Sequence, residues 1–292
     1  AGTWPAALWD EIAANGLDRV LVPEEKGGIG GSWEDAFVIL RAAGRHAAPV
    51  PLAETIGAGY LLAQAGLDAP EGPLSLAEDV SRVPWAAQAV QVLVGDGENK
   101  FGVFSLAGAE ITPDRNLGRD PRDGMAGTAE ATGDGDVMAI GALVRACQMS
   151  GAISQVLELC ITYAGERVQF GRPIGKFQAI QQQLAILAGE AAAADIAAQV
   201  ACRALDRSGG ALFEIATAKI RAGEAAGKAA AISHQVFGAI GFTDEHHLHH
   251  LTRRLWSWRA EFGAESIWAK GLGRLVVEQG ADSLWPNLTK TI

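Results

Sequence analysis

Residues 163–185 read YAGERVQFGRPIGKFQAIQQQLA, a short polar break between two long helical patterns. Three cations, Arg167, Arg172 and Lys176, fall within ten residues of this break. A helix carboxyl end favours cations through its dipole, so an ordinary basic helix end accounts for them. Because arginine offers forked donors to phosphate, a phosphate or pyrophosphate site is the alternative.

The chain after residue 137 is helical in pattern nearly to its end. Apolar and small side chains recur at three- and four-residue spacing in five segments: 138–168, 177–207, 211–238, 244–258 and 264–279. Small residues lie on so many faces of the first three segments that close helix packing is expected. Five helices joined by short loops predict an antiparallel bundle over residues 137–292.

The first half of the chain predicts two further regions. Residues 1–70 have the pattern of helices separated by loops, with Ser32 as an expected N-cap. Residues 71–136 shift toward Gly, Pro and Asp, with β-prone runs at 89–95, 101–107 and 126–133. Gly-Asp-Gly-Glu-Asn between the first two runs is a hairpin signal. The expected fold is mainly α: an N-terminal helical region, a small middle β domain and a C-terminal helical bundle.

Composition excludes several classes of function. The chain has 292 residues and a net charge of −10, whereas non-specific nucleic-acid binding needs clustered cations. No uninterrupted apolar run approaches the roughly 18 to 20 residues that span a bilayer, and the first residues lack the pattern of a secretory leader. We therefore expect a cytoplasmic protein with no membrane or nucleic-acid partner. Its cysteines lack metal-ligand spacing and are expected to be small buried hydrophobes: Cys147, Cys160 and Cys202.

Two polar motifs do not establish a site on their residues alone. The glycine-rich stretch 21–32, LVPEEKGGIGGS, matches neither phosphate-binding loop pattern, so a structural turn is favoured. The histidines of 245–250, EHHLHH, have the helical spacing of a zinc-chelating pair. No neighbouring Asp, Glu or Cys completes a metalloenzyme motif, so no metal is predicted. The sequence also lacks the motifs of serine hydrolases and zinc proteases.

Three blocks in order along the chain resemble one known family, the acyl-CoA dehydrogenases, which are FAD enzymes that desaturate acyl-CoA thioesters. Residues 163–185 resemble its Arg-x-x-Phe-Gly-x-Pro-Ile element with the flanking Tyr and Phe-Gln. Residues 234–254, HQVFGAIGFTDEHHLHHLTRR, are similar to its Gln-x-x-Gly-Gly-x-Gly segment and the arginine after it. Residues 21–36, LVPEEKGGIGGSWEDA, match its Val-Pro-Glu-Glu-x-Gly-Gly-x-Gly. The family's order of helices, β domain and helical bundle agrees with the pattern above.

The resemblance implies FAD contacts at two segments. In this family the Arg-x-x-Phe-Gly loop of one subunit reaches the FAD pyrophosphate of a neighbour. The implied contacts with the dinucleotide there are Arg167, Gln169 and Phe170. The Gln-x-x-Gly segment lines the adenine side, where the implied contacts are Gln235, Gly238 and Ala239. Alanine at the last of these positions adds a methyl group where the family usually has a second glycine.

The chain also departs from the family. The first departure is that the chain begins inside the expected first helical hairpin. The second is a reduced β region, in which SLAEDV at 75–80 only weakly resembles a Thr-Glu-Pro segment and the Trp-Ile-Thr stretch that covers the flavin is not recognisable. The third departure lies at 257–266, SWRAEFGAES, which aligns with the catalytic corner.

In most members the base that removes the α-proton is the Glu of a Tyr-Glu-Gly-Thr turn. An ungapped alignment back from Arg274 puts Phe262 on that position and Glu261 one residue early. Some relatives place the base on the first helix of the C-terminal half, which here falls at about Gly141. A one-residue offset redirects a side chain by about 100° in a helix, so Glu261 is only a weak candidate for the base. Glu265 is expected to stabilise the dipole of the following helix.

The resemblance implies a subunit of an FAD-dependent acyl-CoA dehydrogenase, similar to partner-type subunits of α2β2 enzymes of steroid side-chain degradation. A homologous subunit would then supply the base, and an electron acceptor would reoxidise the flavin. One alternative is a self-sufficient homo-oligomeric dehydrogenase that uses Glu261. Another is a flavin-free structural or regulatory paralogue, which is favoured if Arg167 and Gln235 face solvent or the protein's own core.

Overall fold

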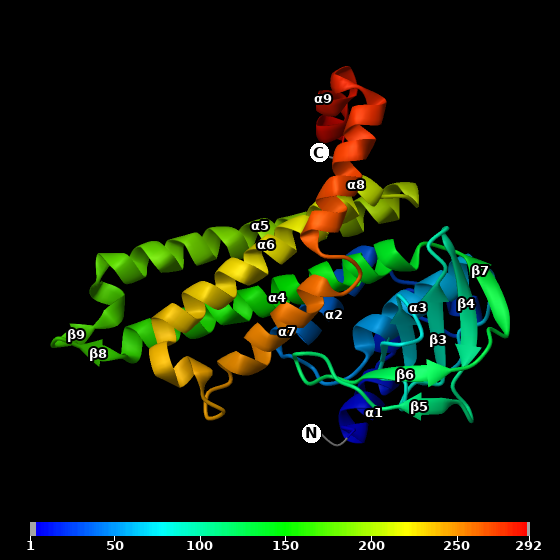
Figure 1. Cartoon of the computed structure of the whole chain (residues 1–292), viewed down its shortest axis with the longest axis horizontal. Coiled ribbons are helices and arrows are strands. Elements are labelled where there is room, and N and C mark those ends of the chain that lie inside the picture. Colours follow the sequence, from blue (N-terminus) through cyan, green and yellow to red (C-terminus); the bar gives the residue numbers. More distant parts are fainter. Residues whose placement is uncertain (1–3, 291–292) are drawn as a thin grey trace.

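A computed structural model describes residues 4–290 of the chain, which form a long helical bundle with a β region at one end (Figure 1). Three helices come first: α1 (Ala6–Ala14), α2 (Trp33–Arg45) and α3 (Leu52–Gln64). Ser32 caps α2 as predicted, in a capping box with Asp35. The glycine-rich stretch before it is a structural turn, as expected, because a Cβ on Gly28 would lie 2.0 Å from the Val22 carbonyl oxygen.

The β region contains two small sheets. The four-stranded sheet has the order β1 (Leu74–Ala77), β3 (Gln91–Gly95), β4 (Lys100–Ser105) and β7 (Ala131–Asp134), with β1 parallel to β3 and the other pairs antiparallel. The three-stranded sheet has the order β2 (Val83–Pro84), β6 (Arg122–Ala126) and β5 (Glu110–Thr112). The predicted hairpin joins β3 to β4. The strand expected at 126–133 is confirmed only at its ends, because β6 ends at Ala126, residues 127–130 link the two sheets, and β7 begins at Ala131.

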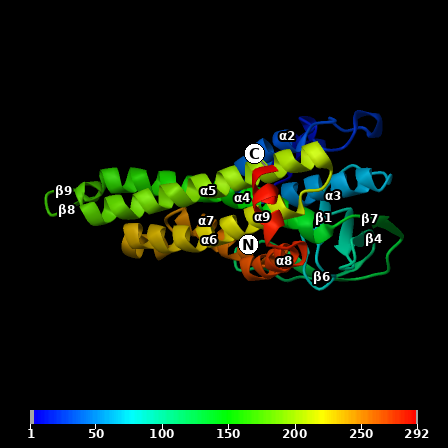
Figure 2. The ribbon, with the colours of Figure 1, turned by 90° about the horizontal axis from the view of Figure 1, so that it is seen from above.

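The C-terminal half forms the expected helical bundle (Figures 1 and 2). Its helices are α4 (Val137–Glu166), α5 (Gln178–Ser208), α6 (Leu212–Phe237), α7 (Leu248–Ala260), α8 (Glu265–Gln279) and α9 (Ala281–Lys290). A two-stranded hairpin, β8 (Val168–Gln169) and β9 (Arg172–Pro173), separates α4 from α5. The helix α9 lies beyond the last predicted segment, and α8 and α9 project from the side of the bundle in Figure 1.

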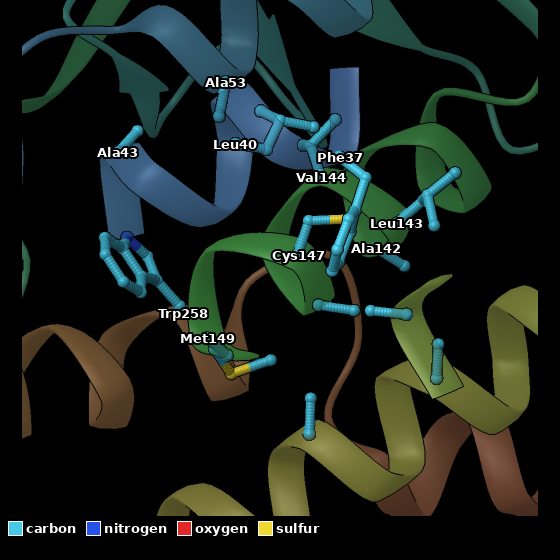
Figure 3. Close-up of a cluster of buried hydrophobic side chains, with 14 of the residues drawn as sticks. Phe37, Leu40, Ala43, Ala53, Ala142, Leu143, Val144, Cys147, Met149 and Trp258 are labelled. Atoms are coloured by element: carbon cyan, nitrogen blue, oxygen red, sulfur yellow. The ribbon is translucent and has the colours of Figure 1, made fainter. Parts of the chain in front are cut away.

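The helices before and after the β region share one hydrophobic core. Phe37 and Leu40 of α2 pack in one cluster with Val144 and Cys147 of α4 (Figure 3). A second, smaller cluster lies within the β region. The boundaries at residues 70 and 136 therefore mark changes in sequence pattern. That they separate three domains stays a prediction.

Helices α2 and α4 cross with their backbones in contact. A Cβ on Gly44 would lie 1.9 Å from the Gln148 carbonyl oxygen, and one on Gly151 would lie 1.9 Å from the Arg41 carbonyl oxygen. Glycine is required at both positions because any side chain would push the two helices apart.

The three cysteines are fully buried, as predicted. The sulfur atoms of Cys147 on α4 and Cys202 on α5 are 3.7 Å apart. Burial raises the pKa of Cys160 to about 12, so this thiol stays protonated and unreactive at neutral pH.

Two helices within residues 4–290, α4 and α5, are long and apolar enough to cross a membrane by length and composition alone. The apolar window of α4 is 89% buried inside the fold, which identifies it as a core helix. The window of α5 is 28% buried, and one such helix is weak evidence for a membrane span.

Gly151→Ala is predicted to destabilise the fold by about 1–3 kcal/mol, because the added methyl group overpacks the contact between α2 and α4. The matched control is Gly189→Ala on α5, where an added Cβ would meet nothing within 4 Å. That variant is expected to be about 0.5–1 kcal/mol more stable than the wild type. Urea unfolding of the full chain measures both, and equal effects would contradict the backbone contact.

Candidate active site

The polar turn that joins α7 to α8 is held in place by a buried lysine. Phe262 and Gly263 in this turn have positive φ angles of 52° and 80°. Lys219 of α6, fully buried, donates from Nζ to the carbonyl oxygens of Trp258, Arg259 and Gly263 at 3.2, 2.9 and 2.8 Å. Carbonyls at a helix end need such partners because none is available within the helix. Burial lowers the pKa of Lys219 to about 8. The turn is therefore fixed relative to α6.

Glu261 lies at the centre of a buried ion network. Its carboxylate accepts two hydrogen bonds of 2.9 Å from Arg122, one of 2.8 Å from Arg145 and one of 3.0 Å from Asn116. Arg145 also donates to Glu54 at 2.5 Å. Burial alone would raise the pKa of Glu261, but Arg122 and Arg145 hold that pKa well below its usual range. A carboxylate held anionic by four donors is a poor proton acceptor at neutral pH.

The two positions at which the resemblance places a base contact each other. Phe262 is 2% exposed, and a Cβ added to Gly141 of α4 would lie 2.2 Å from its Cδ1 atom. The ring therefore occupies the space that a side chain at Gly141 would fill. The guanidinium carbon of Arg145 lies 5.7 Å from the centre of the same ring. Neither position carries a carboxylate, and an aromatic ring fills the space between them.

A cavity of about 410 Å³ lies beside this turn, between the β region and α7. Glu78, directly after β1, lines the cavity and accepts a hydrogen bond of 2.5 Å from the Phe262 amide. Burial, with the neighbouring Glu261 charge, raises the pKa of Glu78. Glu78 was not among the predicted site residues, although the resemblance of 75–80 to a Thr-Glu-Pro segment was an available signal. Nothing in the sequence pointed to Arg122 or Arg145.

The residues with implied FAD contacts in the first segment lie on the β8–β9 hairpin. Phe170 and Gly171 form its two-residue turn with φ of 52° and 78°, the left-handed pair that a tight hairpin requires. This turn leaves the Phe170 ring 93% exposed. Arg167 and Gln169 are exposed beside it. Arg172 instead lies over the Phe177 ring, with its guanidinium carbon 4.3 Å from the ring centre.

The second implied contact segment lies at the end of α6. Gln235, Gly238 and Ala239 are all exposed. Gly238 has a φ of 63° and an open surface, because a Cβ there would meet nothing within 4 Å. Ala239 lies in a 3₁₀ helix, Gly238–Phe242. The ring of Tyr163 at the end of α4 stacks on the Phe237 ring with centroids 4.3 Å apart, which joins this segment to the base of the hairpin.

Both implied contact segments lie at the end of the bundle opposite the β region (Figure 1). Along α4, Gly141 and Arg167 are 26 residues apart. At 1.5 Å per residue this separates them by about 39 Å along the helix axis. The catalytic corner and the hairpin of this chain therefore lie at opposite ends of α4.

Family models for the N-terminal and C-terminal domains of acyl-CoA dehydrogenases match residues 1–69 and 136–274. The acyl-CoA dehydrogenase IpdE2 of Mycobacterium tuberculosis is 33% identical over 256 residues, which cover 83% of this chain and 78% of that protein. The chain belongs to the acyl-CoA dehydrogenase family. IpdE2 of Mycolicibacterium smegmatis is 30% identical, over 82% of this chain and 78% of that protein.

Solved acyl-CoA dehydrogenases share the fold. The ChsE4-ChsE5 complex from Mycobacterium tuberculosis has a chain with a TM-score of 0.86 and 21% identity, covering 95% of this chain and 90% of that one. A variant of the steroid acyl-CoA dehydrogenase Tcur3481-Tcur3483 has a TM-score of 0.81 and 24% identity, covering 94% and 89%. These likenesses confirm the predicted fold class. Membership of the acyl-CoA dehydrogenase family implies oxidoreductase chemistry on acyl-CoA with FAD as cofactor.

The histidine string belongs to the start of α7 and to the loop before it. His249 is buried, and its Nδ1 lies 2.7 Å from the His246 carbonyl oxygen. Within residues 4–290 no group of three His, Cys, Asp or Glu side chains is placed to hold a metal ion. Glu265 begins α8, as its predicted role requires, and also accepts a hydrogen bond of 2.8 Å from Arg259.

Glu261→Gln is predicted to cost about 3–5 kcal/mol of unfolding free energy at pH 7, because Arg122 and Arg145 lose their shared anion. The pKa of Glu261 is depressed in the folded state, so its contribution is present above an unfolded pKa of about 4.3 and is lost as pH falls below it. The difference in unfolding free energy between wild type and variant should therefore shrink from about pH 5 to about pH 3. Urea unfolding across this range measures it.

The control for that series is Glu158→Gln, which removes an exposed partner of Arg45. It is expected to cost less than about 1 kcal/mol at pH 7. A Glu261→Gln cost no larger than this control would show that the buried network does not stabilise the fold.

Proposed function

We propose that this chain is the subunit of an FAD-dependent acyl-CoA dehydrogenase that lacks the catalytic base, and that a homologous subunit supplies the base in an α2β2 assembly. The observation that carries this proposal is the contact of Phe262 with Gly141, since an apolar ring and a glycine stand at the two family positions for the base. The ion pairs of Glu261 with Arg122 and Arg145 also support the proposal, because they keep this carboxylate anionic and bound to the two arginines.

In this assembly the hairpin and the end of α6 complete the partner's FAD site. The residues present fit a dinucleotide: Arg167 offers forked donors to a diphosphate, Phe170 an exposed ring, and Gly238 an open backbone. FAD when bound accepts a hydride from the β-carbon of the thioester. The role of this chain is to bind and orient the dinucleotide and to shield it from water. A separate electron acceptor completes the cycle.

Exposure of Arg167 and Gln235 is also the outcome expected of a flavin-free paralogue. A loop that reaches a neighbour is equally exposed in the isolated chain, so exposure does not separate the two interpretations. The forked donors of Arg167 and the open backbone at Gly238 favour the flavin site.

The projecting helices suit a subunit contact. Helix α8 has no buried residue within the chain. Large apolar side chains on α8 and α9 are exposed, among them Ile267 (61%), Val277 (80%) and Trp285 (73%). Apolar and aromatic surface of this kind is typical of protein interfaces.

A second candidate function, a self-sufficient dehydrogenase, is favoured by Glu78 rather than by Glu261. Glu78 lines the 410 Å³ cavity and has a raised pKa, which suits a general base. Its hydrogen bond from the Phe262 amide opposes this role, because that bond stabilises the anion and occupies one oxygen.

Co-expression with a homologous acyl-CoA dehydrogenase subunit tests the proposal. We expect a colourless, inactive chain when it is expressed alone, and a yellow, active assembly with equal numbers of the two subunits. Absorbance spectra, native mass spectrometry and acyl-CoA dehydrogenation assays measure these outcomes. Within the assembly, Glu78→Gln should keep activity within about threefold of wild type, since the base lies in the partner. A yellow, active assembly of this chain alone that Glu78→Gln inactivates would overturn the proposal in favour of the second candidate.

Arg167→Ala is predicted to weaken FAD retention by the assembly about 10- to 100-fold, which corresponds to the loss of a charge-assisted hydrogen bond of about 1.5–3 kcal/mol. The matched control is Arg172→Gln, which removes the same charge from the same hairpin at a side chain that lies on Phe177. Flavin titration of the deflavinated assembly gives the dissociation constants. Equal losses in both variants would indicate a general charge effect and count against a specific contact.

A further inference from the structure

A separate cavity of about 260 Å³ lies between the loop 115–121 of the β region and the first turns of α7. Its lining includes four arginines and two histidines: Arg115, Arg119, Arg253, Arg254, His249 and His250. Asp120 is the single carboxylate among the lining residues. In a chain with a net charge of −10, this is a local concentration of positive charge.

Most of this positive charge has no internal counterion. Arg254 forms a buried, two-point pair with Asp120, at 2.7 and 3.1 Å, so these two charges cancel. Arg253 and Arg115 each donate one hydrogen bond, at 2.9 and 3.0 Å, to a loop carbonyl oxygen. Within residues 4–290 no carboxylate lies at ion-pair distance from Arg115, Arg119 or Arg253. Three guanidinium groups therefore keep donors for an external anion.

The loop that forms one wall is held in a defined shape. Its ends are joined by an isolated bridge, Arg115 to Pro121, and the Gly118 amide donates to the Ser257 hydroxyl at 2.8 Å. Arg119 has a φ of 68°, a left-handed conformation that glycine would adopt at lower cost. Strain of this kind persists where the surrounding structure imposes it, and it clusters at binding sites.

We propose that this cavity binds the phosphate group of a small ligand. Guanidinium groups bind phosphate through forked donors, and here they converge from two elements, the loop and α7. A concave site with converging donors suits a compact tetrahedral anion better than the surface of a protein partner. The site lies against the β region, away from the hairpin that carries Arg167, and the proposal does not depend on the proposed function.

The proposal is tested by titrating the full chain with inorganic phosphate, with diphosphate and with coenzyme A at constant ionic strength in chloride buffer. Isothermal titration calorimetry should detect binding of at least one of these probes. Arg119→Gln and Arg253→Gln are each expected to weaken that binding at least tenfold. Arg45→Gln, which removes an arginine paired with Glu158 on the helical side, should leave it unchanged.

Arg119→Gly separates loss of the site from loss of the fold. Glycine accepts the positive φ without strain, so this variant should lose binding as Arg119→Gln does while its unfolding temperature does not fall. Coenzyme A binding that is tighter than phosphate binding and is lost in the variants would identify a nucleotide phosphate. Equal affinities would identify free phosphate.

Two results would overturn the proposal. One is failure of the wild type to bind any of the probes. The other is normal binding of every probe by the Arg119→Gln/Arg253→Gln double variant. If that variant also no longer assembles with a homologous subunit, the cavity is a protein contact.

Discussion

The fold depends on a buried ion network that joins its three parts. Glu54 comes from α3, Arg122 from β6, Arg145 from α4 and Glu261 from the turn after α7. Two carboxylates and two guanidinium groups make the network neutral, and each charge would be costly in the interior without its partners. The N-terminal helices, the β region and the bundle are therefore held in one arrangement by one set of ion pairs.

The same network explains why the catalytic corner differs from the family pattern. Once the Glu261 carboxylate is bound by the arginines, the next residue is turned toward α4, where Gly141 leaves room for a ring. Phe262 fills that space, and Lys219 fixes the backbone around it. The carboxylate one position early is therefore part of the scaffold, and Glu78 lines the cavity beside it.

Helix α4 has a different functional segment at each of its ends. One of its ends packs under the catalytic corner, and the other carries the hairpin with Arg167 and Phe170. A helix of this length holds the two sites about 39 Å apart along its axis. The distribution of functional groups within one chain is thus the physical reason for expecting an active site shared between subunits.

Local chemistry was predictable from the sequence alone. The Ser32 capping box, the hairpin between β3 and β4, the long helices and the buried cysteines depend on residues close together in the chain or on simple periodicity. Three motifs in order along the chain, at 21–36, 163–185 and 234–254, indicated the family. The strand expected at 126–133 was misplaced because the chain passes between two sheets there. Helix α9 was missed although it directly follows α8.

Only the tertiary structure decided the roles of individual charged residues. In sequence Glu261 is a carboxylate near a catalytic motif, and Arg122 and Arg145 are unremarkable cations. Both arginines lie more than 100 residues from Glu261 in the chain, so no local pattern reveals the pairing. Whether a carboxylate acts as a base depends on the charges around it in space, and those are set by packing rather than by neighbours in the chain.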